Sequence, residues 1–414
     1  MSHRRPLYGW LGADAVSLIG TRVSMIAIPW FVLTTTGSAT QTGLVALAEM
    51  LPLVVLKVLG GPIIDRLGAR RVAITCDLAS VVVVGAIPLL HHADLLTLPV
   101  LLVLVAGAGA LRGPGDAAKH SLVPRLAETA QVPMERVTGL GSTVERTATL
   151  VGAGLAGALV SIVGAANAIA VDAASFGLSA GLLAWATMSM RPVAEPDAAE
   201  TERTPYLHQL RQGWDFLRSD PLLLGIAIMV ALNNLLDVAW ATVLMPVWAQ
   251  EYGAGAAGLG LYFAVFAGAS AIGSICAAAW GARLPRYPVY LVAFLITGAP
   301  RFVVLAYDSP LWLLGSVVIA SGFASGFLNP VLGAVIFERI PAPLVGRVSS
   351  LTTAMCFALM PFGGLVGGAL VSWQGLSFAM LAVGATYFLV TIAPALSPRW
   401  KEMNKRAADL PQPG

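Results

Sequence analysis

The sequence predicts an all-α polytopic membrane protein with twelve transmembrane helices in two pseudo-symmetric six-helix bundles. Three observations lead to this fold class: an apolar composition, a series of long apolar runs, and a likeness between the two halves of the chain. The chain has 414 residues, of which 57% are hydrophobic and 11% are charged, and its mean hydropathy is +0.79. Soluble domains carry about 25% charged residues, so this composition indicates a membrane protein.

Apolar runs of about 18 to 25 residues follow one another along the chain, and each is long enough to cross a bilayer as a helix. The runs are continuous rather than alternating, which argues against a transmembrane β-barrel. The predicted spans are residues 9–33, 42–60, 72–90, 97–118, 137–163, 166–188, 221–248, 258–280, 288–306, 311–334, 347–371 and 376–395.

The positive charges orient these spans. Every Lys and Arg outside the spans, including Lys119 just after the fourth, falls on the side of the two termini, and the opposite loops hold none. The positive-inside rule therefore predicts that both termini are cytoplasmic and that the protein lies in the cytoplasmic (inner) membrane. The remaining basic residues lie within spans: Arg22, Lys57, Arg112, Arg146 and Arg301.

A duplication is visible in the sequence. At one ungapped offset, RVTGL (136–140) aligns with RVSSL (347–351), and GALVS (157–161) aligns with GALVS (368–372). Two related halves predict a central site and alternating access by rocking. The expected parts are a bundle over residues 1–190, a cytoplasmic linker over 191–220 with an amphipathic helix in its second half, a bundle over 221–395 and a cytoplasmic tail over 396–414.

One charged loop interrupts the apolar pattern, with the sequence GGPIIDRLGARR at residues 60–71. Its pattern G-x-x-x-D-R-x-G-x-R-R resembles the signature loop between the second and third helices of the major facilitator superfamily, and it lies where that signature belongs. Residues 17–43, 172–176 and 346–361 further resemble bacterial drug:proton antiporters of the macrolide-efflux type. The fifth span departs from the antiporter pattern, because Ala153 takes the place of a Pro.

The resemblance implies a cytoplasmic gate at this loop. Gly61 is expected to let two helices pack closely, and Gly68 to supply a positive φ. Asp65 would lie against the N-terminal end of the helix that starts at Arg347. Three arginines would bind carboxylates or helix C-termini across the seam between the halves, or would only set the topology: Arg66, Arg70 and Arg71.

Ionisable residues within the spans are candidates for proton coupling, since a charge inside a membrane costs several kcal/mol. A carboxyl group buried in this way can bind and release a proton near neutral pH. The alternative is a fixed ion pair, for example between Arg22 and Glu49. The candidates are Glu49, Asp237, Asp14 and Arg22.

A second group of residues is expected to line the substrate cavity. Arg112 has Asp116 four residues later and is expected to pair with it. Arg301 would meet either an anionic group of the substrate or a partner carboxylate. Asn233 shares a helical face with Asp237 and Trp240. The full set is Asn233, Asn234, Trp240, Arg112, Glu145, Arg146 and Arg301.

The sequence argues against an enzyme. It has no G-x-x-x-x-G-K-[ST] phosphate loop, and GLSAG (177–181), which fits a hydrolase pattern, lies inside an apolar span. We expect no metal site, no cofactor beyond a proton gradient, and no nucleic-acid partner. The predicted function is proton-coupled efflux of amphipathic or drug-like small molecules by a monomer in the lipid bilayer. The alternatives are an uncoupled or symport-type uptake facilitator for a specific metabolite, and a non-transporting membrane sensor or binding protein.

Overall fold

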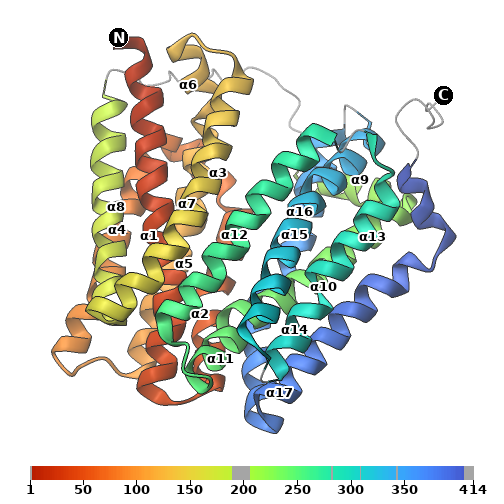
Figure 1. Ribbon diagram of the computed structural model, residues 1–414. Helices are drawn as coiled ribbons and strands as arrows, with labels where there is room; N and C mark the ends of the chain where they lie inside the picture. The colour runs from red at the N-terminus through yellow and green to blue at the C-terminus, as the bar shows by residue number, and fades with distance from the viewer. Residues whose placement is uncertain (1, 189–205, 281–282, 308, 342–343, 405–414) are drawn as a thin grey trace. The chain divides into compact units, whose positions relative to one another are not determined.

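A computed structural model describes residues 2–188, 206–280, 283–307, 309–341 and 344–404. The described residues are almost entirely helical and contain no strand, which confirms the predicted fold class (Figure 1). The first half contains α1 (Arg5–Thr36), α2 (Ala39–Leu59), α3 (Gly61–Leu67), α4 (Ala69–His92), α5 (Leu98–Ser121), α6 (Val123–Ala130), α7 (Met134–Val163) and α8 (Ala165–Ala186).

The second half begins with α9, which ends the linker, and its spans are more often broken. The seventh span consists of α10, a π-helical turn from Trp240 to Leu244, and α11; the ninth is interrupted at Gly298. The helices are α9 (Tyr206–Ser219), α10 (Pro221–Ala239), α11 (Met245–Glu251), α12 (Gly255–Trp280), α13 (Arg286–Thr297), α14 (Ala299–Ala306), α15 (Leu311–Arg339), α16 (Val345–Ala358) and α17 (Met360–Ala395).

The described residues contain 11 helical stretches that are long and apolar enough to cross a membrane. The last of them, Val348–Ala393, contains Gly375 with φ 81° and ψ 175°, a backbone conformation that breaks a helix. Gly375 divides this stretch into the predicted eleventh and twelfth spans. Each of the twelve predicted spans therefore corresponds to described helical structure, with the eleventh formed by α16 and the part of α17 before Gly375 and the twelfth by the part after it.

Helix ends follow from local sequence. α1 ends at Gly37, which adopts a left-handed conformation, and Ser38 then caps α2 by accepting a hydrogen bond from the backbone N–H of Gln41 at 3.2 Å. Gly164 has φ 86° and separates α7 from α8 in the same way.

The chain forms two compact units. Unit 1 consists of Met1–Val193, Ala239–Ala264 and Gly364–Trp373, and unit 2 consists of Ala194–Val238, Val265–Gly363 and Gln374–Gly414. Unit 1 thus combines the first half with parts of the seventh, eighth and eleventh spans. This grouping follows packing rather than sequence order, and the predicted division at residues 191–220 stays a prediction.

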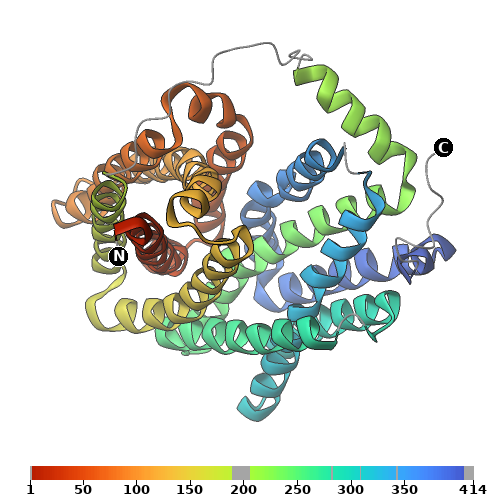
Figure 2. The ribbon, with the colours of Figure 1, turned by 90° about the horizontal axis from the view of Figure 1, so that it is seen from above.

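Within unit 1, α1 packs between α7 and α8, as Figure 2 shows from above, while α5 packs against α2 and α4. Small residues of the fifth and eleventh spans make close crossings. A Cβ on Gly157 would collide with Gly260, and a Cβ on Gly43 would collide with the backbone of Gly364.

Within unit 2, the amphipathic helix α9 packs against α16. The residue Leu217 of α9 is fully buried, in a cluster with Leu223, Ile340 and Val348. The Trp214 side chain stays exposed. The structure therefore places the apolar face of α9 against protein; the linker residues before Tyr206 lie outside the described residues.

Candidate functional site

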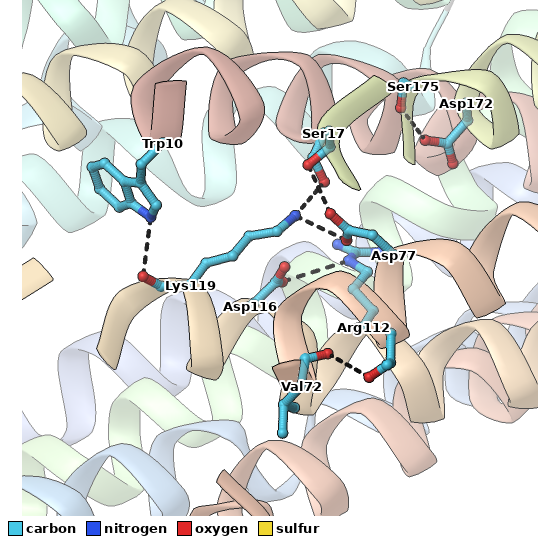
Figure 3. Close-up of polar contacts among 11 residues, drawn as sticks. Trp10, Ser17, Val72, Asp77, Arg112, Asp116, Lys119, Asp172 and Ser175 are labelled. Atoms are coloured by element: carbon cyan, nitrogen blue, oxygen red, sulfur yellow. Dashed lines mark hydrogen bonds and ion pairs between the residues drawn. The ribbon is translucent and has the colours of Figure 1, made fainter. Parts of the chain in front are cut away.

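Helix α5 carries a row of charged side chains into unit 1. Arg112, Asp116 and Lys119 are spaced four and three residues apart, so they lie on one face of the helix. Figure 3 shows this face, where these side chains meet groups from α1 and α4. Helix α2 packs along α5 and brings a further charged side chain, Glu49, to this row.

Glycines of α5 allow α2 to come close. A Cβ on Gly109 would collide with the backbone carbonyl of Glu49, and one on Gly113 with that of Leu53. Because Gly109 and Gly113 carry only a hydrogen atom in place of a Cβ, the backbones of α2 and α5 are in contact. The side chains of Glu49 and Arg112 are thereby brought to the same level of the unit.

Arg112 binds two carboxylates. Its Nη1 atom donates to Glu49 Oε1 at 3.2 Å, and its Nε atom lies 3.9 Å from Asp116 Oδ2. The side-chain exposed fractions are 13% for Glu49, 18% for Arg112 and 36% for Asp116. The predicted pairing of Arg112 with Asp116 is therefore present, but the shorter contact is with Glu49.

A small cavity lies beside Glu49, on the side of the turn between α1 and α2. The cavity has a volume of about 20 Å³. A buried water molecule needs about 10–15 Å³. Met25, Val45 and Met50 make most of its wall apolar, and its polar groups include Thr42 and Thr242. This arrangement can hold a water molecule next to the carboxylate.

The suggested ion pair between Arg22 and Glu49 is wrong, because Arg112 occupies that carboxylate. Arg22 Nη1 instead donates to Met25 Sδ at 3.4 Å. Arg22 takes part in none of the ion pairs found among the described residues, although Glu145 and Asp116 lie within electrostatic range. Glu145 and the adjacent Arg146 are exposed on α7.

A second ion pair in unit 1 was not foreseen. Lys119 was expected in a loop, but it lies in the last turn of α5 and is only 2% exposed. Its Nζ atom lies 3.0 Å from Asp77 Oδ1 of α4 and donates to Ser17 Oγ of α1 at 3.0 Å. The other carboxylate oxygen of Asp77 accepts from Ser179 Oγ of α8 at 2.7 Å.

This buried pair ties four helices together, and each of its charged groups also has a hydrogen bond with a serine hydroxyl, as suits a buried ion pair. Asp14 is buried on α1 within electrostatic range of Lys119. Asp172 of α8 makes a separate link to α1 by accepting from Ser24, and it also accepts from Ser175 at 3.3 Å. Helical spacing along α5 is the sequence signal that could have placed Lys119 on the same face as Arg112 and Asp116.

Unit 2 holds its own ion pair. Arg301 of α14 is bound to Asp237 of α10, and the partner carboxylate expected for Arg301 is thus identified. The guanidinium carbon also lies 4.9 Å from the centre of the Phe302 ring and 5.5 Å from that of Tyr387. Arg301 is 3% exposed, whereas the Asp237 side chain is 42% exposed.

The remaining cavity candidates have different surroundings. Asn233 is buried in unit 2, and neither its amide nitrogen nor its amide oxygen has a hydrogen-bond partner among the described residues. Asn234 donates to the Cys356 carbonyl at 2.9 Å, near the break between α16 and α17. Trp240 is buried in unit 1 against Tyr262 and Phe263. The α-helical repeat that was to place Trp240 on the face of Asn233 ends at Ala239, where the π turn begins.

The signature loop forms α3 and the start of α4. Gly68 has φ 83°, which confirms its predicted role. Gly61 was expected at a close helix crossing, which is wrong: a Cβ there would meet no described atom within 4 Å. Arg70 does bind a helix C-terminus, that of α8, through Thr187 Oγ1 at 2.7 Å and the Ala184 carbonyl at 3.4 Å.

That contact lies within unit 1, between α4 and α8, and not across a seam between halves. Arg66 and Arg71 are exposed. The predicted contacts of Asp65 and Arg347 fall on side chains outside those that the structure describes.

Comparison with known proteins decides the family. The sequence matches the Major Facilitator Superfamily over residues 11–239 and 230–412. The chain belongs to this superfamily. It is therefore a membrane transporter and not an enzyme.

Curated relatives match along the whole chain. The chain is 28% identical over 417 residues to the multidrug efflux pump Tap of Mycobacterium tuberculosis, covering 100% of this chain and 98% of the pump. It is 22% identical over 392 residues to macrolide efflux protein A of Streptococcus pyogenes, covering 92% of this chain and 93% of that protein. The predicted resemblance to drug-efflux members of the superfamily is confirmed.

Solved structures share the fold. The nucleoside transporter NupG superimposes with a TM-score of 0.73 at 15% identity, covering 95% of this chain and 98% of NupG. A bacterial homologue of the iron transporter ferroportin, in an inward-facing state, gives a TM-score of 0.70 at 16% identity, with 95% and 99% covered.

Proposed function

We propose that the protein exports amphipathic or drug-like small molecules in exchange for protons, by alternating access, and that Glu49 binds the coupled proton. The observation that carries the proposal is the Glu49–Arg112 ion pair beside a cavity large enough for water. A carboxylate inside a membrane is costly, and its place beside a single guanidinium and a cavity that can hold water suits reversible protonation.

The names of the relatives support export. Two proteins that match along nearly the whole chain are named an efflux pump for multiple drugs and an efflux protein for macrolides. Neither name identifies a compound for this chain.

The direction of the proton follows from the proposed topology. If both termini are cytoplasmic, the turn between α1 and α2 faces outward, and the cavity lies between that face and Glu49. A proton from outside reaches Glu49 through this cavity and neutralises the carboxylate. A cationic or polar substrate held by that carboxylate then loses its electrostatic attraction and leaves.

The remaining sequence candidates keep proposed roles. Asp237 and Asp14 are secondary sites for proton binding, and the loop over residues 60–71, with Arg347, is the proposed cytoplasmic gate. The cytoplasmic membrane location, the four-part division of the chain and function as a monomer are proposed on the same sequence grounds.

Accumulation of ethidium in cells that express the protein tests this function. Wild-type protein is expected to lower the ethidium level, and both a protonophore and Glu49→Gln are expected to erase the effect. Glu128→Gln is the matched control, because Glu128 is an exposed carboxylate on α6. Export by folded Glu49→Gln protein that still responds to a protonophore would rule out Glu49 as the proton site.

A further inference from the structure

Arg112 is shared by two carboxylates that differ in accessibility. Glu49 holds the guanidinium at 3.2 Å and is 13% exposed, while Asp116 lies at 3.9 Å and is 36% exposed. The two contacts use different nitrogens, Nη1 for Glu49 and Nε for Asp116. The guanidinium can therefore exchange its closer contact with Glu49 for a closer contact with Asp116 while the Arg112 backbone stays in place on α5.

We propose that Asp116 is the alternative partner of Arg112, which holds the guanidinium whenever Glu49 is protonated. This inference rests on the proposed function of Glu49. Asp116 acts here as a positioning residue. It does not carry the coupled proton, but it lowers the free-energy cost of protonating Glu49 by keeping a negative charge beside Arg112.

The physical reason is the cost of a buried charge without a partner. When a proton forms an O–H bond on a Glu49 carboxyl oxygen, Glu49 becomes neutral and Arg112 loses its nearest counter-charge. A buried charge left uncompensated is strongly destabilising. Asp116, one helical turn further along α5, supplies the missing negative charge by closing the 3.9 Å gap. When the proton leaves Glu49, its carboxylate takes the guanidinium back.

Other charged groups lie around this pair on several helices. From α1, Asp14 and Arg22 lie within electrostatic range of Asp116, and from α4 so does Asp77. Asp77 is already bound by Lys119, so it is not free to hold Arg112.

The remaining neighbours do not replace Asp116 either. Asp172 of α8 lies within range of Arg112 but accepts hydrogen bonds from Ser24 and Ser175. Glu145 of α7 lies within range of Arg22. Arg22 adds a second positive charge beside Arg112, which increases the need for a nearby carboxylate.

The test follows Glu49 directly and needs no substrate. Purified full-length protein is titrated with acid while infrared spectroscopy records the C=O band of protonated carboxyl groups. The part of that band which Glu49→Gln removes belongs to Glu49, and its midpoint pH is compared between variants.

Asp116→Asn is expected to move the midpoint to lower pH by about one unit, because protonation of Glu49 then leaves Arg112 without its alternative carboxylate. Asp116→Glu is expected to restore the wild-type midpoint, and Glu128→Gln to leave it unchanged. Thermal unfolding of each variant shows whether it is folded. A merely structural role of Asp116 would change unfolding but would not move the midpoint.

The outcomes separate this inference from the proposed function. A Glu49 midpoint that is the same in wild type and folded Asp116→Asn protein overturns the role of Asp116 and leaves Glu49 as the proton site. The absence of any titrating signal that Glu49→Gln removes would overturn the proton site itself, and the inference with it.

Discussion

Lys119 Nζ and Asp77 Oδ1 lie 3.0 Å apart in the interior of unit 1, and the two side chains are only 3% and 5% exposed. The pair joins the end of α5 to α4, and its hydrogen bonds to Ser17 and Ser179 reach α1 and α8. An ion pair as deeply buried as this one holds a defined arrangement of helices, because neither charge has water to replace the other.

Asp77→Asn is expected to lower the free energy of unfolding by about 3–5 kcal/mol, since it leaves the Lys119 ammonium buried without its carboxylate. Ser179→Ala, which removes one hydrogen bond from the same carboxylate, is expected to cost only about 1 kcal/mol. Thermal unfolding of the purified protein in detergent measures both.

The double variant Asp77→Leu/Lys119→Met is the control, because it removes both charges and keeps the volume filled. It is expected to be more stable than Asp77→Asn alone. An Asp77→Asn protein that unfolds at the wild-type temperature would show that this ion pair does not support the unit.

The spans were predictable from sequence because each needs only a long apolar run, and this signal is local. The ends were less certain where polar residues sit inside the helix. Lys119 lies two residues before the end of α5 and is predicted as a loop cation, although its side chain turns inward to Asp77. Only the packing of α4 on α5 makes that choice visible.

Pairing between helices was the weakest part of the prediction. The i, i+4 contact of Arg112 with Asp116 follows from helical geometry alone. The contact of Arg112 with Glu49 depends on Gly109 and Gly113, which let α2 approach α5 at one particular level. Many glycines of the chain are candidates for such a crossing, so sequence does not show which of them places which charges together.

Gly43 and Gly61 offer a test of that point, since both are glycines but only one lies at a crossing. A Cβ on Gly43 would collide with the backbone of Gly364, whereas one on Gly61 would meet no described atom within 4 Å. Gly43→Ala is therefore expected to lower the free energy of unfolding by about 1–3 kcal/mol. Gly61→Ala is expected to change it by less than about 0.5 kcal/mol.

Chemical or thermal unfolding of the two purified variants side by side measures this difference. Equal stabilities would mean that the crossing of α2 with the Gly364–Trp373 segment is looser than the structure shows.

The ion pair of unit 2 is asymmetric, because Arg301 is 3% exposed and the Asp237 side chain 42%. Asp237→Asn removes the carboxylate from a buried guanidinium, while Arg301→Met leaves a carboxylate that is already 42% exposed and keeps the aromatic packing against Phe302. We expect Asp237→Asn to destabilise by about 2 kcal/mol, after allowance for the exposure of the carboxylate, and Arg301→Met to destabilise less.

The ranking of the two unfolding temperatures checks this expectation. The reverse order would make Arg301→Met the less stable variant. It would show that the contacts of the Arg301 guanidinium with Phe302 and Tyr387 contribute more to stability than its ion pair with Asp237.

Gly375 separates the last two spans, and it does so through its backbone conformation alone. Its φ is 81°, and a Cβ there would meet no described atom within 4 Å. Gly375→Ala is therefore expected to lower the free energy of unfolding by about 1–3 kcal/mol, from backbone strain without any collision.

Gly181→Ala in α8 is the matched control, because its site is equally open but its backbone is helical. Alanine there is expected to raise the free energy of unfolding by up to about 1 kcal/mol. Unfolding of both variants separates strain from crowding: a Gly375→Ala protein as stable as wild type would mean that the turn between these spans does not need the left-handed conformation.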